Sequence, residues 1–152
     1  MTQPQYFEDF AAGQEIPLGS IEVTRDDIIE FATEFDPQDF HMSEEGGKAS
    51  MLGGLAASGW HTASIVMRLL ALNLFNKSTG RGSPGVSKLR WKHPVFAGDV
   101  LSAHAEILGT KPLRSKPGLG LVFIRIRASN QNGKDVIDWE NPVLFERREP
   151  AQ

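Results

Sequence analysis

The segment that most constrains the fold is apolar around almost its whole circumference. It reads ASIVMRLLALNLF over residues 63–75, and Arg68 is its only charged residue. A helix that is hydrophobic all round is stable only where other parts of the protein cover it. We therefore predict a buried helix from about Gly59 to Phe75, and the rest of the chain must supply the covering layer.

The second half of the chain has the pattern expected of that layer. Apolar and polar residues alternate with the period of two that is typical of strands in residues 86–95, 98–108 and 119–129. A further strand is predicted over residues 135–148, with an interruption at Pro142 that indicates an edge or a bulge. Short turns between consecutive strands favour antiparallel pairing. The predicted fold class is α+β, an antiparallel sheet wrapped around one long central helix.

Composition limits the class of protein. A length of 152 residues, with 40% hydrophobic and 23% charged residues, fits one compact domain. The chain has no cysteine, which excludes disulfides and thiolate nucleophiles and agrees with a reducing compartment. The N-terminus has no basic run followed by an apolar stretch, so we expect no signal peptide, no membrane span and a cytoplasmic location. The net charge of -3 argues against a dedicated nucleic-acid-binding protein.

An acid and an imidazole flank a proline in the stretch EFDPQDFH, residues 34–41. Thr24 is placed to cap a helix that begins with the next residue and ends at Pro37. Asp36 and His41 would not lie side by side on a regular helix or strand, but a loop that folds back can bring them together. Taken alone, the pattern favours a structural role, because Asp commonly organises turns through its own side chain.

The order of these motifs resembles that of a known family. FDPQDFH before the long helix, ASGWHTA at its start and LRWKHPVFAGDVL at the entry to the sheet resemble the MaoC-like dehydratases, a hotdog-fold family that includes the (R)-specific enoyl-CoA hydratases. The resemblance covers roughly residues 7–146 and implies a single hotdog domain over residues 1–152. Asp36 and His41 fall on the two catalytic positions of the hydratase signature.

Four positions depart from the family pattern. Gln38 stands where Asn is usual and Asp39 where Pro is usual, while Pro37 directly follows the acid. The added carboxylate of Asp39 is expected to change the pKa values of neighbouring groups. Ser58 stands where many hydratases carry His.

The resemblance implies a lyase of fatty acid metabolism that reversibly hydrates a 2-enoyl-CoA to a 3-hydroxyacyl-CoA. It assigns Asp36 to polarising and deprotonating a water, His41 to orienting that water and carrying the proton, and the Gly59 N–H to the thioester oxygen. The reaction needs a proton acceptor, a proton donor and a stabiliser of negative charge, and a helix N-terminus can supply the last. Ser58 is a weaker catalytic candidate, because on spacing alone it is a helix N-cap.

No cofactor is expected, since coenzyme A is part of the substrate. The scattered histidines lack metal-ligand spacing, so no metal site is predicted either. Four cations are candidates for the coenzyme A phosphates: Arg81, Lys88, Arg90 and Lys92. Such a run on a strand is commonly a solvated face. An exposed sheet edge and an incomplete pocket predict at least a homodimer, with each acyl site at the subunit interface.

Two other functions are compatible with the same fold. A hotdog thioesterase would use a carboxylate on the central helix to activate water, and no Asp or Glu occurs between Gly59 and Phe75. A non-catalytic acyl-CoA-binding or regulatory module would keep the pocket and lose the chemistry. The presence of both Asp36 and His41 argues against that module, while the altered residues between them favour it.

Overall fold

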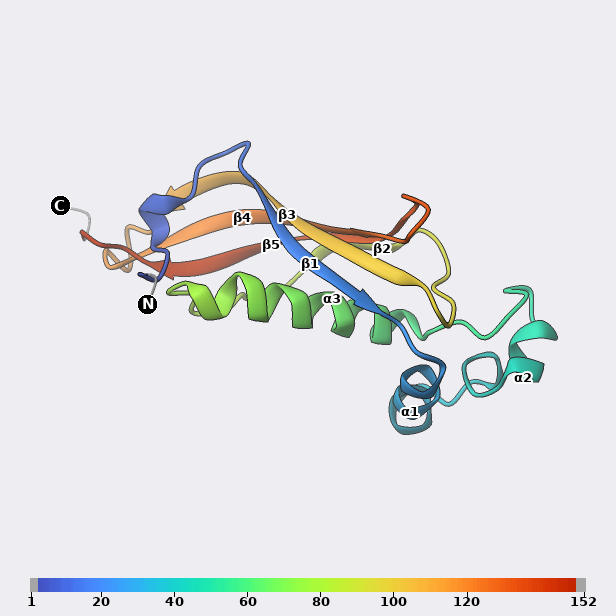
Figure 1. Cartoon of the computed structure of the whole chain (residues 1–152). Helices are drawn as coiled ribbons and strands as arrows, with labels where there is room; N and C mark the ends of the chain where they lie inside the picture. Colours follow the sequence, from blue (N-terminus) through green and yellow to red (C-terminus); the bar gives the residue numbers. More distant parts are fainter. Residues whose placement is uncertain (1–2, 150–152) are drawn as a thin grey trace.

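The computed structural model describes residues 3–149, which form one antiparallel sheet and one long helix (Figure 1). The strands are β1 (Glu15–Glu22), β2 (Ser87–Trp91), β3 (Val100–Pro112), β4 (Leu119–Ser129) and β5 (Asp135–Glu146), in the spatial order β1-β3-β4-β5-β2. The helices are α1 (Arg25–Phe35), α2 (Glu44–Lys48) and α3 (Gly59–Asn73), with 3-10 turns at Phe7–Asp9, Asp39–His41 and Phe75–Lys77. These strands all pair antiparallel, and the arrangement is the predicted α+β hotdog fold.

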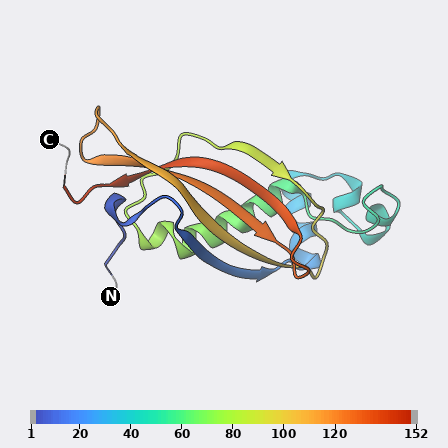
Figure 2. The same cartoon turned by 90° about the horizontal axis from the view of Figure 1, so that it is seen from above.

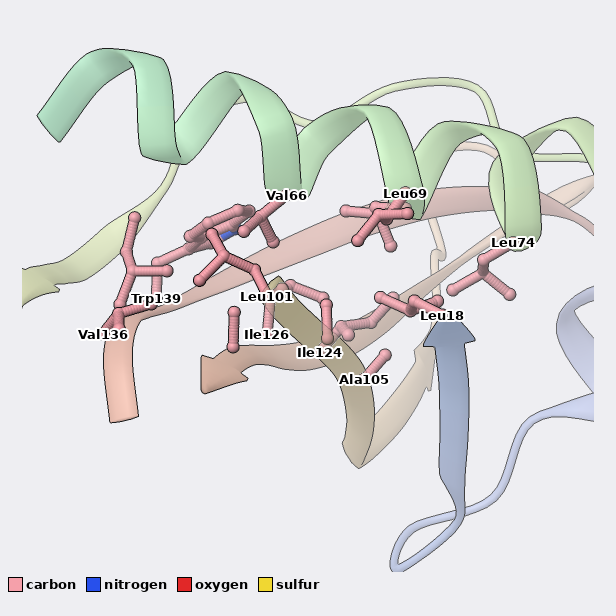
Figure 3. Packing of buried hydrophobic residues seen from close by; sticks show 14 of the residues in the cluster. Leu18, Val66, Leu69, Leu74, Leu101, Ala105, Ile124, Ile126, Val136 and Trp139 are labelled. Atoms are coloured by element: carbon pink, nitrogen blue, oxygen red, sulfur yellow. The ribbon is translucent and has the colours of Figure 1, made fainter. Parts of the chain in front are cut away.

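The core lies between α3 and one face of the sheet (Figure 3). Val66 and Leu70 of α3 are fully buried, and so are Ile124 and Ile126 of β4. The alternation of β4 therefore directs its aliphatic side chains at the helix and its arginines at the opposite face. Burial of each such side chain contributes about 1.5–3 kcal/mol. No helix in the described part of the chain is both long and apolar enough to cross a membrane.

The prediction that the whole of α3 is buried is wrong. Trp60 is 58% exposed, Met67 39% and Leu72 47%. A single five-stranded sheet can cover only one side of a helix, so the opposite side of α3 remains open in this chain. The structure thus leaves large apolar side chains of α3 on the surface, and Trp60 and Met67, two turns apart, share one face, which is the pattern of an interaction site.

Two features of the sheet differ from expectation. β5 runs without a break through Pro142, which pairs with Phe123 of β4, and it lies inside the sheet instead of at an edge. Leu144, two residues on, bonds through its own N–H to Gly82 on the side away from β4. The position of the missing N–H of Pro142 faces the same side of β5 as the N–H of Leu144, away from β4. The pairing of β5 with β2 ends at Glu140, so no strand-to-strand hydrogen bond is lost at Pro142.

Strand β1 was not predicted. It carries Pro17 and a positive-φ glycine, Gly19, which shift its register against β3 and hide its alternation of apolar residues. Such residues are tolerated because β1 is an edge strand. Its Leu18 is fully buried and points into the core below α3 (Figure 3).

The segment that carries the acid and the imidazole lies beyond the first turn of α3. Helices α1 and α2 project from that end of the molecule, while the C-terminal end of β5 lies at the opposite end (Figures 1 and 2). Thr24 caps α1 by accepting the Asp27 N–H at 3.2 Å. Ile28 and Ala32 of α1 are fully buried, whereas Phe35, in the last turn of the helix, is exposed. The fold thus brings the exit of α1 to the N-terminus of α3.

Candidate active site

Asp36 is positioned by the end of α1. Helix α1 ends at Phe35, and Asp36 is its C-cap, as Pro37 requires. The Gln38 side-chain amide donates to Asp36 Oδ1 at 2.7 Å, and hydrogen bonding by the Ser58 side chain lowers the pKa of the same carboxylate. The carboxylate is therefore held from its own loop and from the head of α3.

His41 is fixed by a backbone carbonyl. Its Nδ1 lies 2.6 Å from the carbonyl oxygen of Ala56. Because a carbonyl oxygen only accepts, Nδ1 must carry the proton, and in the neutral ring Nε2 has a free lone pair. Nε2 lies 3.5 Å from Asp36 Oδ2, and His41 is buried. The loop thus folds back as predicted, and the two groups are close enough for one water to contact both.

Asp36 stays ionised at neutral pH. Burial raises the pKa of Asp36, but hydrogen bonding by Ser58 and Gln38, together with the charge that His41 carries when it is protonated, outweighs burial and holds the pKa below its usual range. Asp39, the added carboxylate of this loop, is exposed and is not among these causes. Gln38, a departure from the family pattern, supports the acid directly.

Ser58 and Gly59 form the head of α3. Ser58 is fully buried, and its Oγ accepts the Trp60 N–H at 3.3 Å, so it caps the helix while it also holds Asp36. The N–H of Gly59, in the first helical residue, has no acceptor within the helix. A Cβ at Gly59 would lie 2.6 Å from Trp91 Cε2, so only glycine lets the Trp91 ring rest on this turn.

One pocket joins these groups. It has a volume of about 390 Å³, and its lining residues include Asp36, His41, Gly59, Trp60, Trp91, Lys92 and His93. His93 lies in the segment 86–95 that is predicted to be a strand, but it follows the end of β2 and borders the pocket. Neither the Ala56 carbonyl nor the Trp91 contact has a local sequence signal, because each depends on two segments far apart in the chain.

The candidate coenzyme A cations are only partly brought together. Lys88, Arg90 and Lys92 border one hollow beside β5, whereas Arg81 forms a salt bridge with Glu146. Glu146 lies six residues, or about 20 Å, further along β5 than Glu140, the partner of Lys88. The structure does not bring Arg81 into this group.

The remaining cations differ in their partners. Lys88 Nζ lies 3.1 Å from Glu140, and Lys92 Nζ lies 2.9 Å from Asp138. Arg90 has no carboxylate within salt-bridge distance among residues 3–149. Arg90 is therefore the member of the hollow most available to a phosphate.

His61 lies between α1 and α3 and does not face the pocket. It is buried, stacks on Phe31 with ring centroids 4.8 Å apart, and its Nδ1 has no hydrogen-bond partner among the described residues. Burial lowers the pKa of His61, although the charge of Asp27 opposes the shift.

A pH-dependent stability follows from His61. Because its pKa is lower in the folded state, the unfolded chain binds more protons once the pH falls below about 6.5, and the free energy of unfolding must then decrease. His61→Leu is expected to flatten this decrease between about pH 7 and pH 5. Urea denaturation at each pH measures the free energy of unfolding. If the free energy of unfolding decreases equally with falling pH in the variant and the wild type, His61 does not cause this pH dependence.

The family can now be assigned. A family model described as "MaoC like domain" matches residues 9–121. The chain belongs to the MaoC-like family. A crystal structure of a MaoC-like dehydratase from Rhodospirillum rubrum is 38% identical, with a TM-score of 0.89, and the match covers 95% of this chain and 98% of that one.

Two curated relatives add to this. "Uncharacterized protein YdeM" of Bacillus subtilis is 31% identical over 140 residues, which are 92% of this chain and 98% of the relative. A mesaconyl-CoA hydratase of Cereibacter sphaeroides is 36% identical over 67 residues, which are 44% of this chain and 19% of the relative. The MaoC-like architecture therefore extends over nearly the whole chain, while the likeness to the named hydratase is confined to part of it.

Proposed function

We propose that this MaoC-like protein hydrates the double bond of a 2-enoyl-CoA and catalyses the reverse dehydration. The observation that carries the proposal is the approach of His41 Nε2 to Asp36 Oδ2, at 3.5 Å, in the pocket that Gly59 also borders. These are the acceptor, the donor and the anion-stabilising group that the reaction needs. The match to a MaoC-like dehydratase structure supports it.

The proposed reaction begins with a water held between Asp36 and His41. The ionised carboxylate accepts one hydrogen of the water, and the lone pair of Nε2 accepts the other. As the water oxygen bonds to the β-carbon of the substrate, its O–H bond breaks and the proton passes to the Asp36–His41 pair. The electrons of the double bond move toward the thioester, and its oxygen becomes negative.

The Gly59 N–H then stabilises the thioester oxygen. An unsatisfied N–H at a helix N-terminus is suited to this charge, and the helix dipole adds to it. The pair returns the proton to the α-carbon, which gives the 3-hydroxyacyl-CoA and restores both side chains. In this scheme Ser58 acts as a positioning residue, because it is buried beside Asp36 and is not among the residues that line the pocket.

A thioesterase is less well supported. The carboxylate that would attack the carbonyl carbon is expected on α3, and that helix has no Asp or Glu. The non-catalytic module is disfavoured by Gln38, because this residue holds the acid in the site instead of disturbing it.

Coenzyme A is proposed to bind with its phosphates near Arg90. Arg90→Ala is expected to raise KM for an enoyl-CoA by about tenfold, and by much less for a truncated thioester without the nucleotide, because a charge-assisted hydrogen bond is lost only with the former. Arg81→Ala is the matched control, since it removes an arginine outside the hollow. Steady-state kinetics measure both. Equal effects on both substrates would exclude Arg90 from coenzyme binding.

A homodimer at least is proposed, with each site completed by the second subunit. The exposed side chains of Trp60 and Met67, which share one face of α3, and the free edge of β2 support it, because both are surfaces that a second copy can cover. Light scattering at micromolar concentration is expected to give twice the mass of the chain or more. A monomeric mass would contradict this arrangement and a shared site.

One assay separates the proposed reaction from its alternatives. The protein is incubated with a panel of 2-enoyl-CoA and 3-hydroxyacyl-CoA thioesters, and both the absorbance of the conjugated double bond and the free thiol are followed. A hydratase changes the first signal and leaves the second unchanged. Release of free thiol would identify a thioesterase. No change in either signal, together with measurable binding of the thioester, would identify the non-catalytic module.

A further inference from the structure

Two hollows meet at Trp60. The catalytic pocket is one, and the second, with a volume of about 340 Å³, lies along the open face of α3. The second hollow is almost wholly apolar; its lining residues are Trp60, Ala63, Ser64, Met67, Val86, Leu89 and Trp139. Ala63, Ser64 and Met67 follow Trp60 at helical spacings of one and two turns, so they share its face of α3. Trp60 is the residue that borders both spaces.

The position of Trp60 is fixed by Trp91. The two indoles meet edge to face, with ring centroids 5.0 Å apart and planes at 83°. Trp91 is itself anchored, because its Nε1–H donates to the carbonyl oxygen of Gly59 at 2.7 Å. Such an edge-to-face pair is a favourable aromatic arrangement that adds to the stabilisation from buried area. A ligand that displaced Trp60 would lose this contact beside the turn that carries the candidate oxyanion donor.

We propose that Trp60 closes the catalytic pocket against the second hollow and so limits the substrate to short acyl groups. This inference rests on the proposed function, because it places the acyl chain in the pocket of Asp36 and His41. A short chain ends at the Trp60 ring. A longer chain would need the space that the ring occupies before it could reach the apolar hollow beyond, so the specificity of this chain is set by one side chain.

We call the separation of the two hollows by the Trp60 ring the boundary. Binding of S-alkyl-CoA thioethers tests this boundary independently of catalysis, since these ligands can be neither hydrated nor hydrolysed. Calorimetry is expected to show that the wild-type protein binds the butyl thioether at least as tightly as the octyl thioether. Trp60→Ala should tighten binding of the octyl thioether by about tenfold or more, the effect of opening an apolar pocket to additional methylene groups. Turnover of crotonyl-CoA and octenoyl-CoA is measured on the same samples and should shift in the same direction.

Two further variants locate the effect. Ser64→Leu, added to Trp60→Ala, places a larger side chain in the second hollow and should remove most of the gain for the octyl thioether. Leu72→Ala shortens another exposed apolar side chain of α3 that borders neither of these hollows, and it should keep the wild-type preference.

The outcomes for the boundary and for the reaction are distinguishable. If the thioethers follow this pattern while no enoyl-CoA is hydrated, the boundary stands and the proposed reaction fails. If enoyl-CoA is hydrated while Trp60→Ala keeps the wild-type chain-length profile, the reaction stands and the boundary is overturned. A failure of every thioether to bind also overturns the boundary.

Discussion

Replacing Asp36 by Asn is expected to lower kcat by about two to four orders of magnitude, the range for a positioned acid–base group. His41→Ala should have an effect of similar size. KM should change little in either variant, because neither side chain is proposed to bind the nucleotide. Steady-state kinetics on a 2-enoyl-CoA measure these changes, and the double variant should be hardly worse than either single one, since groups that act on one water are strongly non-additive.

The stability of the Asp36→Asn variant distinguishes a catalytic role of Asp36 from a purely structural role in the turn. An amide oxygen can still accept from Gln38 and Ser58, and Asn serves the same turn as Asp. The lowered pKa of Asp36 means that its charge favours the folded state above about pH 4, so a modest loss at neutral pH is expected. A variant that is fully active yet clearly less stable would show that the Asp36 loop is a helix exit and nothing more.

Replacing Gly47 by Ala is expected to destabilise the fold by about 3 kcal/mol, because the added methyl group has no space. A Cβ at Gly47 would overlap the carbonyl group of Gly54 and lie 2.5 Å from the backbone nitrogen of Leu55. These are backbone atoms that cannot rotate away. The next residue, Ala56, carries the carbonyl that orients His41, so kcat should fall together with the free energy of unfolding.

Gly54→Ala is the matched control for this prediction. A Cβ at Gly54 would meet only the Phe96 ring, at 3.4 Å, which is an ordinary contact. Urea denaturation should therefore show a much smaller loss of stability than for Gly47→Ala. Similar losses in the two variants would mean that the close approach of α2 to the Gly54 segment does not support the site.

Local chemistry made part of the geometry of the candidate site predictable from sequence, whereas the catalytic roles were implied only by the family resemblance. Pro37 ends α1 and turns the chain, so the closeness of Asp36 and His41 follows from a short stretch of residues. Gly59 at the head of a strongly apolar helix was likewise recognisable, because helix N-termini leave free N–H groups. The roles of Gln38 and the Ala56 carbonyl were not, since each depends on where a side chain or a distant backbone segment finally lies.

The fold was predictable where the alternation of apolar and polar residues along a strand is uninterrupted. Burial alternates along β4: Val122, Ile124, Ile126 and Ala128 are buried, and the residues between them are not. β1 was missed because Pro17 and Gly19 interrupt its pattern, and Pro142 was misread because a missing N–H matters only on the side where a partner strand lies. The exposure of Trp60 could not be inferred, because apolar sequence alone does not tell whether the same chain or a second copy covers a helix face.

The central claim is that water adds across a carbon–carbon double bond of an acyl thioester. The most direct measurement is mass spectrometry of the products formed from crotonyl-CoA in isotopically labelled water, with Asp36→Asn as the control. If water adds in this way, labelled oxygen appears in the 3-hydroxyl group of an intact CoA thioester, and Asp36→Asn greatly lowers the rate at which this labelled product forms. Label in a free carboxylate, or label at the 3-position formed equally fast by Asp36→Asn, would contradict it.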